Sequence, residues 1–190
     1  LITITALFLI KKAIVNNIGK LVVLTAFIAY LFSLNHLVTF IPLSNYLNPE
    51  YLVGHAKIQY NMLNLVPFKT ISETLVRNIS SFAPVTLIQI MGNLLMLTPL
   101  AFALMYLSIL KNKKKTIMVT MLISIGIEII QFIETFIGAA FLGFARSTDI
   151  DDVILNTLGG VIGVYIYLFF NHFISKSHFD RLKISYRFSR

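Results

Sequence analysis

The chain has 190 residues, of which 57% are hydrophobic and only 13% are charged. Soluble domains carry roughly 25% charged residues, so this composition and a mean hydropathy of +0.82 exclude an ordinary water-soluble domain and place part of the surface in lipid. The net charge of +8 does not indicate nucleic-acid binding, because basic runs beside apolar spans record membrane orientation, and the lack of cysteine excludes disulfides and cysteine-ligated metal sites.

The first predicted element is an N-terminal segment, residues 1–20. Its opening run L-I-T-I-T-A-L-F-L-I is too short to cross a hydrocarbon core of roughly 30 Å. Lys11 and Lys12 follow the apolar run, which is the reverse of the order in a signal peptide. We therefore expect an interfacial helix that lies on the membrane.

Four later stretches are apolar over about 20 residues or more, the length that a helix needs to span a bilayer. They are residues 21–43, 84–110, 116–137 and 153–172. Pro99 lies inside the second stretch and is expected to kink that helix. The predicted fold class is an all-α integral membrane protein, a bundle of four transmembrane helices over residues 21–172.

The basic residues predict the orientation of this bundle. The loop K-N-K-K-K between the second and third spans, the segment before the first span and the tail 173–190 hold twelve of the sixteen basic residues. Seven of the eight acidic residues fall on the other side. We therefore expect both termini in the cytoplasm of a multi-pass protein of the bacterial cell membrane.

The predicted outer loop, residues 44–83, contains a turn and a helix. In Asn64-Leu-Val-Pro-Phe68, Pro67 disfavours a helical conformation of the residue before it, which indicates a turn against the membrane surface. Apolar residues then recur at helical spacing opposite two charged ones, at Ile71, Leu75, Val76 and Ile79 against Glu73 and Arg77. This pattern predicts an amphipathic helix on the outer surface, placed to cover a site beneath it.

Polar side chains recur in the outer half of every predicted span. Ionisable residues inside a membrane are costly and face a bundle interior or a wet cavity. The polar residues share faces within their helices and one depth between helices, and they are Ser33, His36, Gln89, Asn93, Glu128, Gln131, Asp149, Asp152 and Asn156. We expect them to form an extracytoplasmic polar pocket, with Asn64 and Arg146 from the adjoining loops.

Structural roles compete with this interpretation. Asp149, Asp151 and Asp152 could cap the fourth span, where Thr148-x-x-Asp151 fits a capping box, and Glu128 is expected to contact Arg146 or Asn156. His36 and His55 are interpreted as satisfied or solvated histidines. Close helix packing is expected at Gly92, Pro99, Gly159, Gly160 and Gly163.

Four motifs resemble the VanZ-like family, in order along residues 64–167. They are N-L-V-P-F, G-N-L-L-M-L-T-P-L, I-E-I-I-Q-F and R-S-T-D-I-D-D-V-I-L-N-T-L-G-G. The resemblance implies a bacterial cell-envelope protein that contributes to glycopeptide tolerance, since the founding member is associated with teicoplanin resistance. The motif positions fall on Asn64, Pro67, Phe68, Gly92, Asn93, Pro99, Glu128, Gln131, Arg146, Asp149, Asp152, Asn156 and Gly159.

Two functions follow as hypotheses. In the first, the pocket binds an outer-leaflet ligand, without catalysis and without a cofactor. The ligand is a cell-wall precursor, a lipid headgroup or the lipoglycopeptide itself, and membrane lipids are the other partners. In the second, Glu128 and Asp152 serve an enzyme acting on a lipid-linked phosphate or sugar, and Asp149 and Asp152 help to hold Mg²⁺. A transporter is disfavoured, because the inner halves of the spans are nearly pure hydrocarbon.

Overall fold

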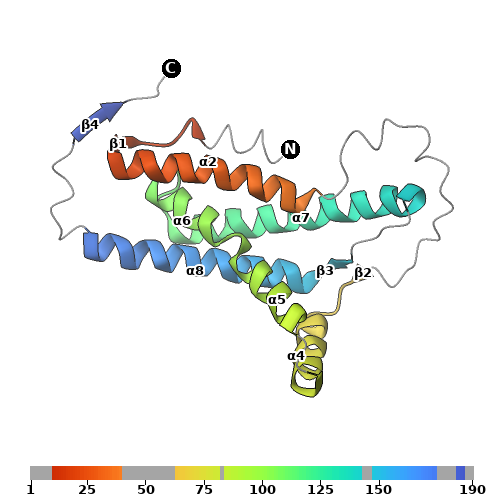
Figure 1. The fold of residues 1–190 in the computed structure, drawn as a ribbon. Coiled ribbons are helices and arrows are strands. Elements are labelled where there is room, and N and C mark those ends of the chain that lie inside the picture. The colour runs from red at the N-terminus through yellow and green to blue at the C-terminus, as the bar shows by residue number, and fades with distance from the viewer. Residues whose placement is uncertain (1–9, 40–62, 82–83, 143–146, 175–182, 187–190) are drawn as a thin grey trace.

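The structure is a computed structural model that describes residues 10–39, 63–81, 84–142, 147–174 and 183–186. Most of the predicted N-terminal interfacial helix, much of the outer loop including His55, and Arg146 lie outside the described residues. The described chain is mostly helical (Figure 1).

Four helical segments are long and apolar enough to cross a membrane: Ile18–Val38, Leu87–Tyr106, Lys113–Thr135 and Ile150–Phe173. They correspond one to one to the predicted spans, which confirms a multi-pass membrane protein. The helices concerned are α2 (Ile18–Val38), α5 (Pro84–Met96) with α6 (Thr98–Tyr106), α7 (Lys113–Leu142) and α8 (Ile150–Ile174).

The second span is broken into α5 and α6 at Leu97. Pro99 lies in the first turn of α6, where its missing N–H costs little, so the predicted kink is a complete break. Two hydroxyl groups hold the broken segment. Tyr30 of α2 donates to the carbonyl oxygen of Met96 at 2.7 Å, and Thr98 donates to the carbonyl oxygen of Gly159 in α8 at 3.0 Å.

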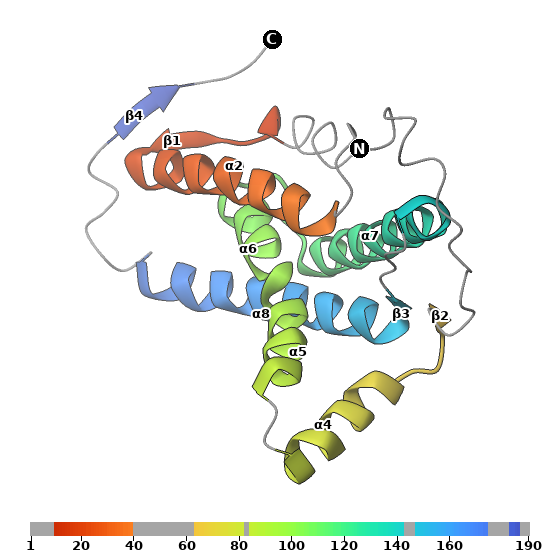
Figure 2. The same ribbon diagram turned by 45° about the vertical axis from the view of Figure 1, so that its right-hand side comes forward.

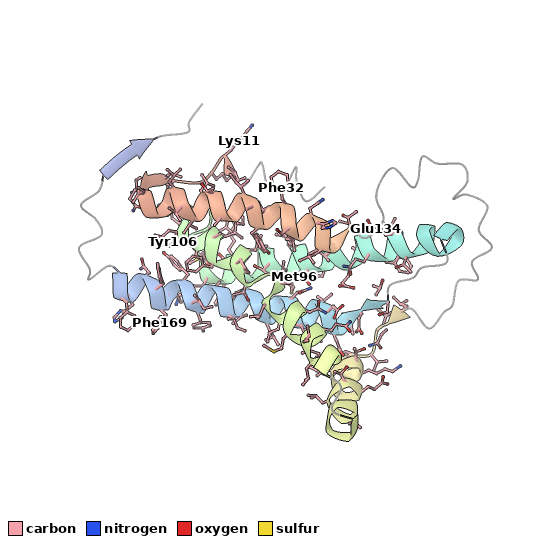
Figure 3. All side chains as sticks on the ribbon, in the orientation of Figure 1. Lys11, Phe32, Met96, Tyr106, Glu134 and Phe169 are labelled. Carbon is pink, nitrogen blue, oxygen red and sulfur yellow. The ribbon has the colours of Figure 1, made fainter. Side chains whose placement is uncertain are left out.

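Helix α8 packs against α5, α6 and α7 and lies on the side of the bundle away from α2, with α6 and α7 between the two (Figures 1 and 2). The apolar core lies mainly between α2 and α6 and includes Leu34, Leu100 and Leu104. Large apolar side chains also cover the outside, as lipid contact requires. Phe32 of α2 and Phe169 of α8 are 68% and 67% exposed and point away from opposite sides of the bundle (Figure 3).

Two short strand pairs correct the prediction of an all-α fold. Strand β1 (Val15–Asn17) pairs antiparallel with β4 (Lys183–Tyr186), which joins the segment before the first span to the basic tail. Strand β2 (Leu63–Asn64) pairs parallel with β3 (Thr148–Asp149) at the opposite end of α8. Strands of two to four residues are too short to show the alternating pattern from which strands are recognised.

A helix forms where the amphipathic helix was predicted, as α4 (Lys69–Ser81). It contacts α5 and α8 and lies near the start of α8, at what we call the α4 end of the bundle (Figure 2). Thr74 is buried, whereas Leu75 and Val76 are exposed. In a membrane protein this exposed apolar face is suited to lipid contact.

Candidate functional site

The antiparallel helices α7 and α8 set the framework of the candidate site, and two contacts fix their register. A Cβ atom on Gly160 would lie 2.5 Å from Cγ2 of Thr120, so these residues are opposite one another. Nearer the α4 end, the Glu128 carboxylate accepts a hydrogen bond from the Asp149 N–H at 3.1 Å. One helical turn separates residues four apart, which places Ser124 opposite Asn156.

The first part of the site is a group of hydrogen bonds that we call the clasp: Asn64, Phe68, Thr70, Asp149 and Asp151. The Asp149 carboxylate accepts hydrogen bonds from the Asn64 amide at 2.9 Å, from the Thr70 hydroxyl and from the Asp151 N–H at 2.9 Å. The last bond makes Asp149 the N-cap of α8. A single carboxylate therefore starts α8 and ties it to the turn before α4.

Asp151 caps a different helix from the one that the sequence indicated. Its carboxylate accepts hydrogen bonds from the N–H groups of Phe68 and of Ile71, the latter at 3.0 Å, so it caps α4. Phe68 has φ of 63°, a left-handed conformation that is rare for a bulky residue, and the bond to Asp151 helps to hold it. The predicted capping box is not formed, because the buried Thr148 hydroxyl has no partner among the described residues.

The second part of the site is a buried polar layer between α5, α7 and α8, which consists of Asn93, Glu128, Gln131, Asp152 and Asn156. The Asn93 amide donates to the Asp152 carboxylate, and Glu128 accepts from the backbone of the clasp. Polar residues predicted on three different spans therefore meet within the same part of the bundle. The layer lies directly beside the clasp, one to two turns into the bundle.

Three predicted pocket residues do not join this layer. Ser33 and His36 are exposed on α2, and Ser33 donates to the Ala29 carbonyl of its own helix, because α2 turns its leucine face to the bundle. Gln89 is also exposed. It lies on the first half of α5, which runs away from α8 towards α4 (Figure 2).

Several buried polar atoms have no hydrogen-bond partner among the described residues. They are the amide N and O of Asn156, Oε1 of Gln131 and the hydroxyl of Ser124. Asn156 and Ser124 are 0% exposed and Gln131 is 2% exposed. Asn156 therefore makes no hydrogen bond to Glu128, and the expected contact of Glu128 with Arg146 lies outside the described residues. An unpaired buried polar group costs about 1–3 kcal/mol, so these atoms are the least satisfied part of the layer.

Ser124 belongs to a polar stripe on α7 that the sequence interpretation missed. The stripe recurs every three or four residues and is buried throughout, at Thr116, Thr120, Ser124, Glu128, Gln131, Glu134 and Thr135. It corrects the statement that the inner halves of the spans are nearly pure hydrocarbon. The signal was present in the sequence as a helical repeat of hydroxyl-bearing residues continuing the repeat of Glu128 and Gln131.

Glycines bring α8 against its neighbours. A Cβ on Gly159 would lie 2.0 Å from the Leu94 carbonyl oxygen, and one on Gly163 would lie 2.3 Å from the Thr98 carbonyl oxygen. Gly92 does not pack in this way, because a Cβ there would meet nothing within 4 Å. Pro99 is exposed and acts through the helix break rather than by packing.

The carboxylates of the site do not form a metal centre in the part of the chain that the structure describes, where no three His, Asp or Glu side chains are grouped suitably. Asp149 is occupied by the clasp, and Asp152 is bound to Asn93. The magnesium pair of the enzyme hypothesis, Asp149 and Asp152, stays a prediction.

A family model described as VanZ/LLP1 matches residues 22–171. The matched region runs from the start of α2 almost to the end of α8 and includes the clasp and the buried polar layer. No curated protein and no solved structure gives a significant match.

Proposed function

Since the chain belongs to the VanZ/LLP1 family, we propose that it binds a polar ligand of the outer leaflet in the buried polar layer and so contributes to glycopeptide tolerance of a bacterial cell envelope. The candidate ligands are a cell-wall precursor, a lipid headgroup and the lipoglycopeptide itself. The α4 end of the bundle is the outer end in this proposal, as the distribution of basic residues favours.

The observation that carries the proposal is the unpaired amide of Asn156. A buried side chain that can donate and accept hydrogen bonds, and does neither within the described residues, is destabilising unless a ligand or water supplies its partners. Gln131 lies on the facing helix with an unpaired oxygen of its own. Both residues border the carboxylates of Glu128 and Asp152.

The surrounding hydrogen bonds keep this site in shape before a ligand arrives. Asn93 holds Asp152, and the Asp149 backbone holds Glu128. Side chains fixed by such supporting bonds recognise a ligand with little loss of entropy. Arg146 lies four positions before the first residue of α8 in the sequence, and we assign it the binding of a phosphate or carboxylate of the same ligand.

The test replaces Asn156 by leucine and measures teicoplanin tolerance in a susceptible bacterium that expresses the chain, with its membrane level followed by immunoblot. Removing unpaired polar atoms from a buried position does not destabilise a fold when the shape is kept, so loss of tolerance at normal protein level would indicate lost binding. Thr157→Val is the matched control, because the Thr157 hydroxyl only bonds back to Val153 of its own helix. Undiminished tolerance in Asn156→Leu would contradict the proposal.

A further inference from the structure

The polar residues between α7 and α8 form a column that runs inward from the clasp, which we call the polar column: Gln131, Glu128, Asp152, Asn156 and Ser124. Their order along the column follows from the register of the two helices. Gln131 lies nearest the clasp, Glu128 and Asp152 face each other one turn deeper, and Ser124 and Asn156 come last.

The inner end of the polar column is closed. Beyond Ser124 and Asn156, the next residues are Thr120 and Gly160, which are in such close contact that a Cβ on Gly160 would lie 2.5 Å from Thr120. The Thr120 hydroxyl bonds back to the Thr116 carbonyl at 2.8 Å and so faces its own helix. The run of unpaired polar groups therefore ends at this close contact and does not continue across the bundle.

The chemistry of the polar column selects the class of ligand. Oε1 of Gln131 and the amide O of Asn156 are unpaired acceptors, and the Ser124 hydroxyl accepts as readily as it donates. Among the described residues, the amide N of Asn156 is the one unpaired side-chain group of the column that only donates. Two carboxylates lie between them. None of the residues 84–96, 121–142 and 147–160, which supply the walls of this region, is basic. An anionic group would be repelled here, whereas a compact cation with several N–H donors is matched.

We propose that the polar column binds a protonated primary amine carried by the ligand. The ammonium group lies at the level of Glu128 and Asp152 and is within one helical turn of both Gln131 and Asn156. Its positive charge is balanced by the carboxylates, and its three N–H donors satisfy acceptors that are otherwise unpaired. The inference rests on the proposed binding function and names the chemical group that the site recognises.

Three sources of this group are compatible with the same chemistry: the amino headgroup of a phospholipid, a free amino group of a cell-wall peptide, and an amino group of a lipoglycopeptide. Isothermal titration of the purified full chain in nanodiscs of phosphatidylglycerol tests them separately. The probes are dihexanoyl phosphatidylethanolamine, a lysine-containing muramyl tripeptide and teicoplanin, each compared with its N-acetylated form, with dihexanoyl phosphatidylglycerol as the anionic probe.

We expect at least one free-amine probe to bind about tenfold or more tightly than its N-acetylated form, because acetylation removes charge-assisted hydrogen bonds. The probe that does so identifies the source. Asn156→Leu and Asp152→Asn should each weaken that binding, and Thr157→Val should leave it unchanged. Asp152→Asn keeps an oxygen for the Asn93 amide, so it tests the charge rather than the fold.

The outcomes separate the two proposals. Equal binding of free and acetylated probes, weakened by Asn156→Leu, would overturn the assignment of an amine and leave the binding function in place. Tighter binding of dihexanoyl phosphatidylglycerol than of every amine probe would overturn it as well. Absence of binding by every probe, together with undiminished teicoplanin tolerance in Asn156→Leu, would overturn both.

Discussion

Substitution of Gly159 by alanine tests how closely α8 is packed in the bundle. The new Cβ would lie 2.0 Å from the Leu94 carbonyl oxygen, and ordinary van der Waals contact begins at 3.4 Å, so the helices must separate by about 1.4 Å. A backbone carbonyl cannot rotate away as a flexible side chain can. The separation also stretches the bond from the Thr98 hydroxyl to the Gly159 carbonyl. Overpacking of this kind costs about 1–3 kcal/mol, and we expect a loss of stability in that range.

The matched control is Gly92→Ala, because a Cβ at Gly92 meets nothing within 4 Å. Alanine is favoured over glycine in a helix by up to about 1 kcal/mol, so this variant should be unchanged or slightly more stable. Both variants are compared with the parent chain by SDS titration in mixed micelles, followed by the helical circular dichroism signal. Equal unfolding midpoints for Gly159→Ala and Gly92→Ala would refute the close approach of α8 to α5.

Three further predictions concern the clasp, the helix break and the topology. Asp151→Ala removes the acceptor for two N–H groups at the start of α4. It should lower the free energy of unfolding by about 0.5–2 kcal/mol and speed hydrogen exchange in that turn. The control is Glu73→Ala at an exposed position, which should change neither the stability nor the exchange rate. Tyr30→Phe should lower the free energy of unfolding by about 0.5–1.5 kcal/mol, because it loses the hydrogen bond to the Met96 carbonyl at the α5–α6 break. Tyr165 is exposed, and an equal loss of stability in Tyr165→Phe would argue against that bond. The chain has no cysteine, so single substitutions to cysteine report topology. A membrane-impermeant thiol reagent added to intact cells should label a cysteine in place of Glu73 but not one in place of Lys113. The reverse labelling would show that the orientation is inverted.

The spans and the disturbance of the second span could be predicted from the sequence for a simple physical reason. Hydropathy measures how well a segment is solvated by lipid, and each long apolar run became a helix. Pro99 cannot donate a backbone hydrogen bond, so a disturbance near it followed directly. The meeting of Asn93, Glu128 and Asp152 was also predictable, since the cost of burying each of them in hydrocarbon favours their convergence.

Capping of the fourth span was predicted and Asp149 does it, but the bonds of Asp149 and Asp151 to the turn before α4 and to the start of α4 could not be predicted. Helical spacing relates Asp149, Asp151 and Asp152 to one another within α8, but their partners belong to other elements. Asp151 bonds to backbone N–H groups of a turn some 80 residues earlier, and a backbone donor leaves no mark in the side-chain pattern. Ser124 was overlooked for a different reason. A serine in a helix usually donates a hydrogen bond to a carbonyl of its own helix, but the Ser124 hydroxyl has no such partner among the described residues.

The division of the polar residues between the clasp and the buried polar layer has a consequence for their functions. Both carboxylates of the clasp already accept several hydrogen bonds, and they hold α4, β2 and α8 together. Loss of Asp149 or Asp151 should therefore impair any function by disturbing the fold. Asn156 differs, because its amide makes no hydrogen bond among the described residues. A leucine at this position should therefore stabilise the fold as well as Asn156 does. A phenotype at Asn156 at normal protein level would therefore report on a ligand, which makes this residue the most direct measure of what the site binds.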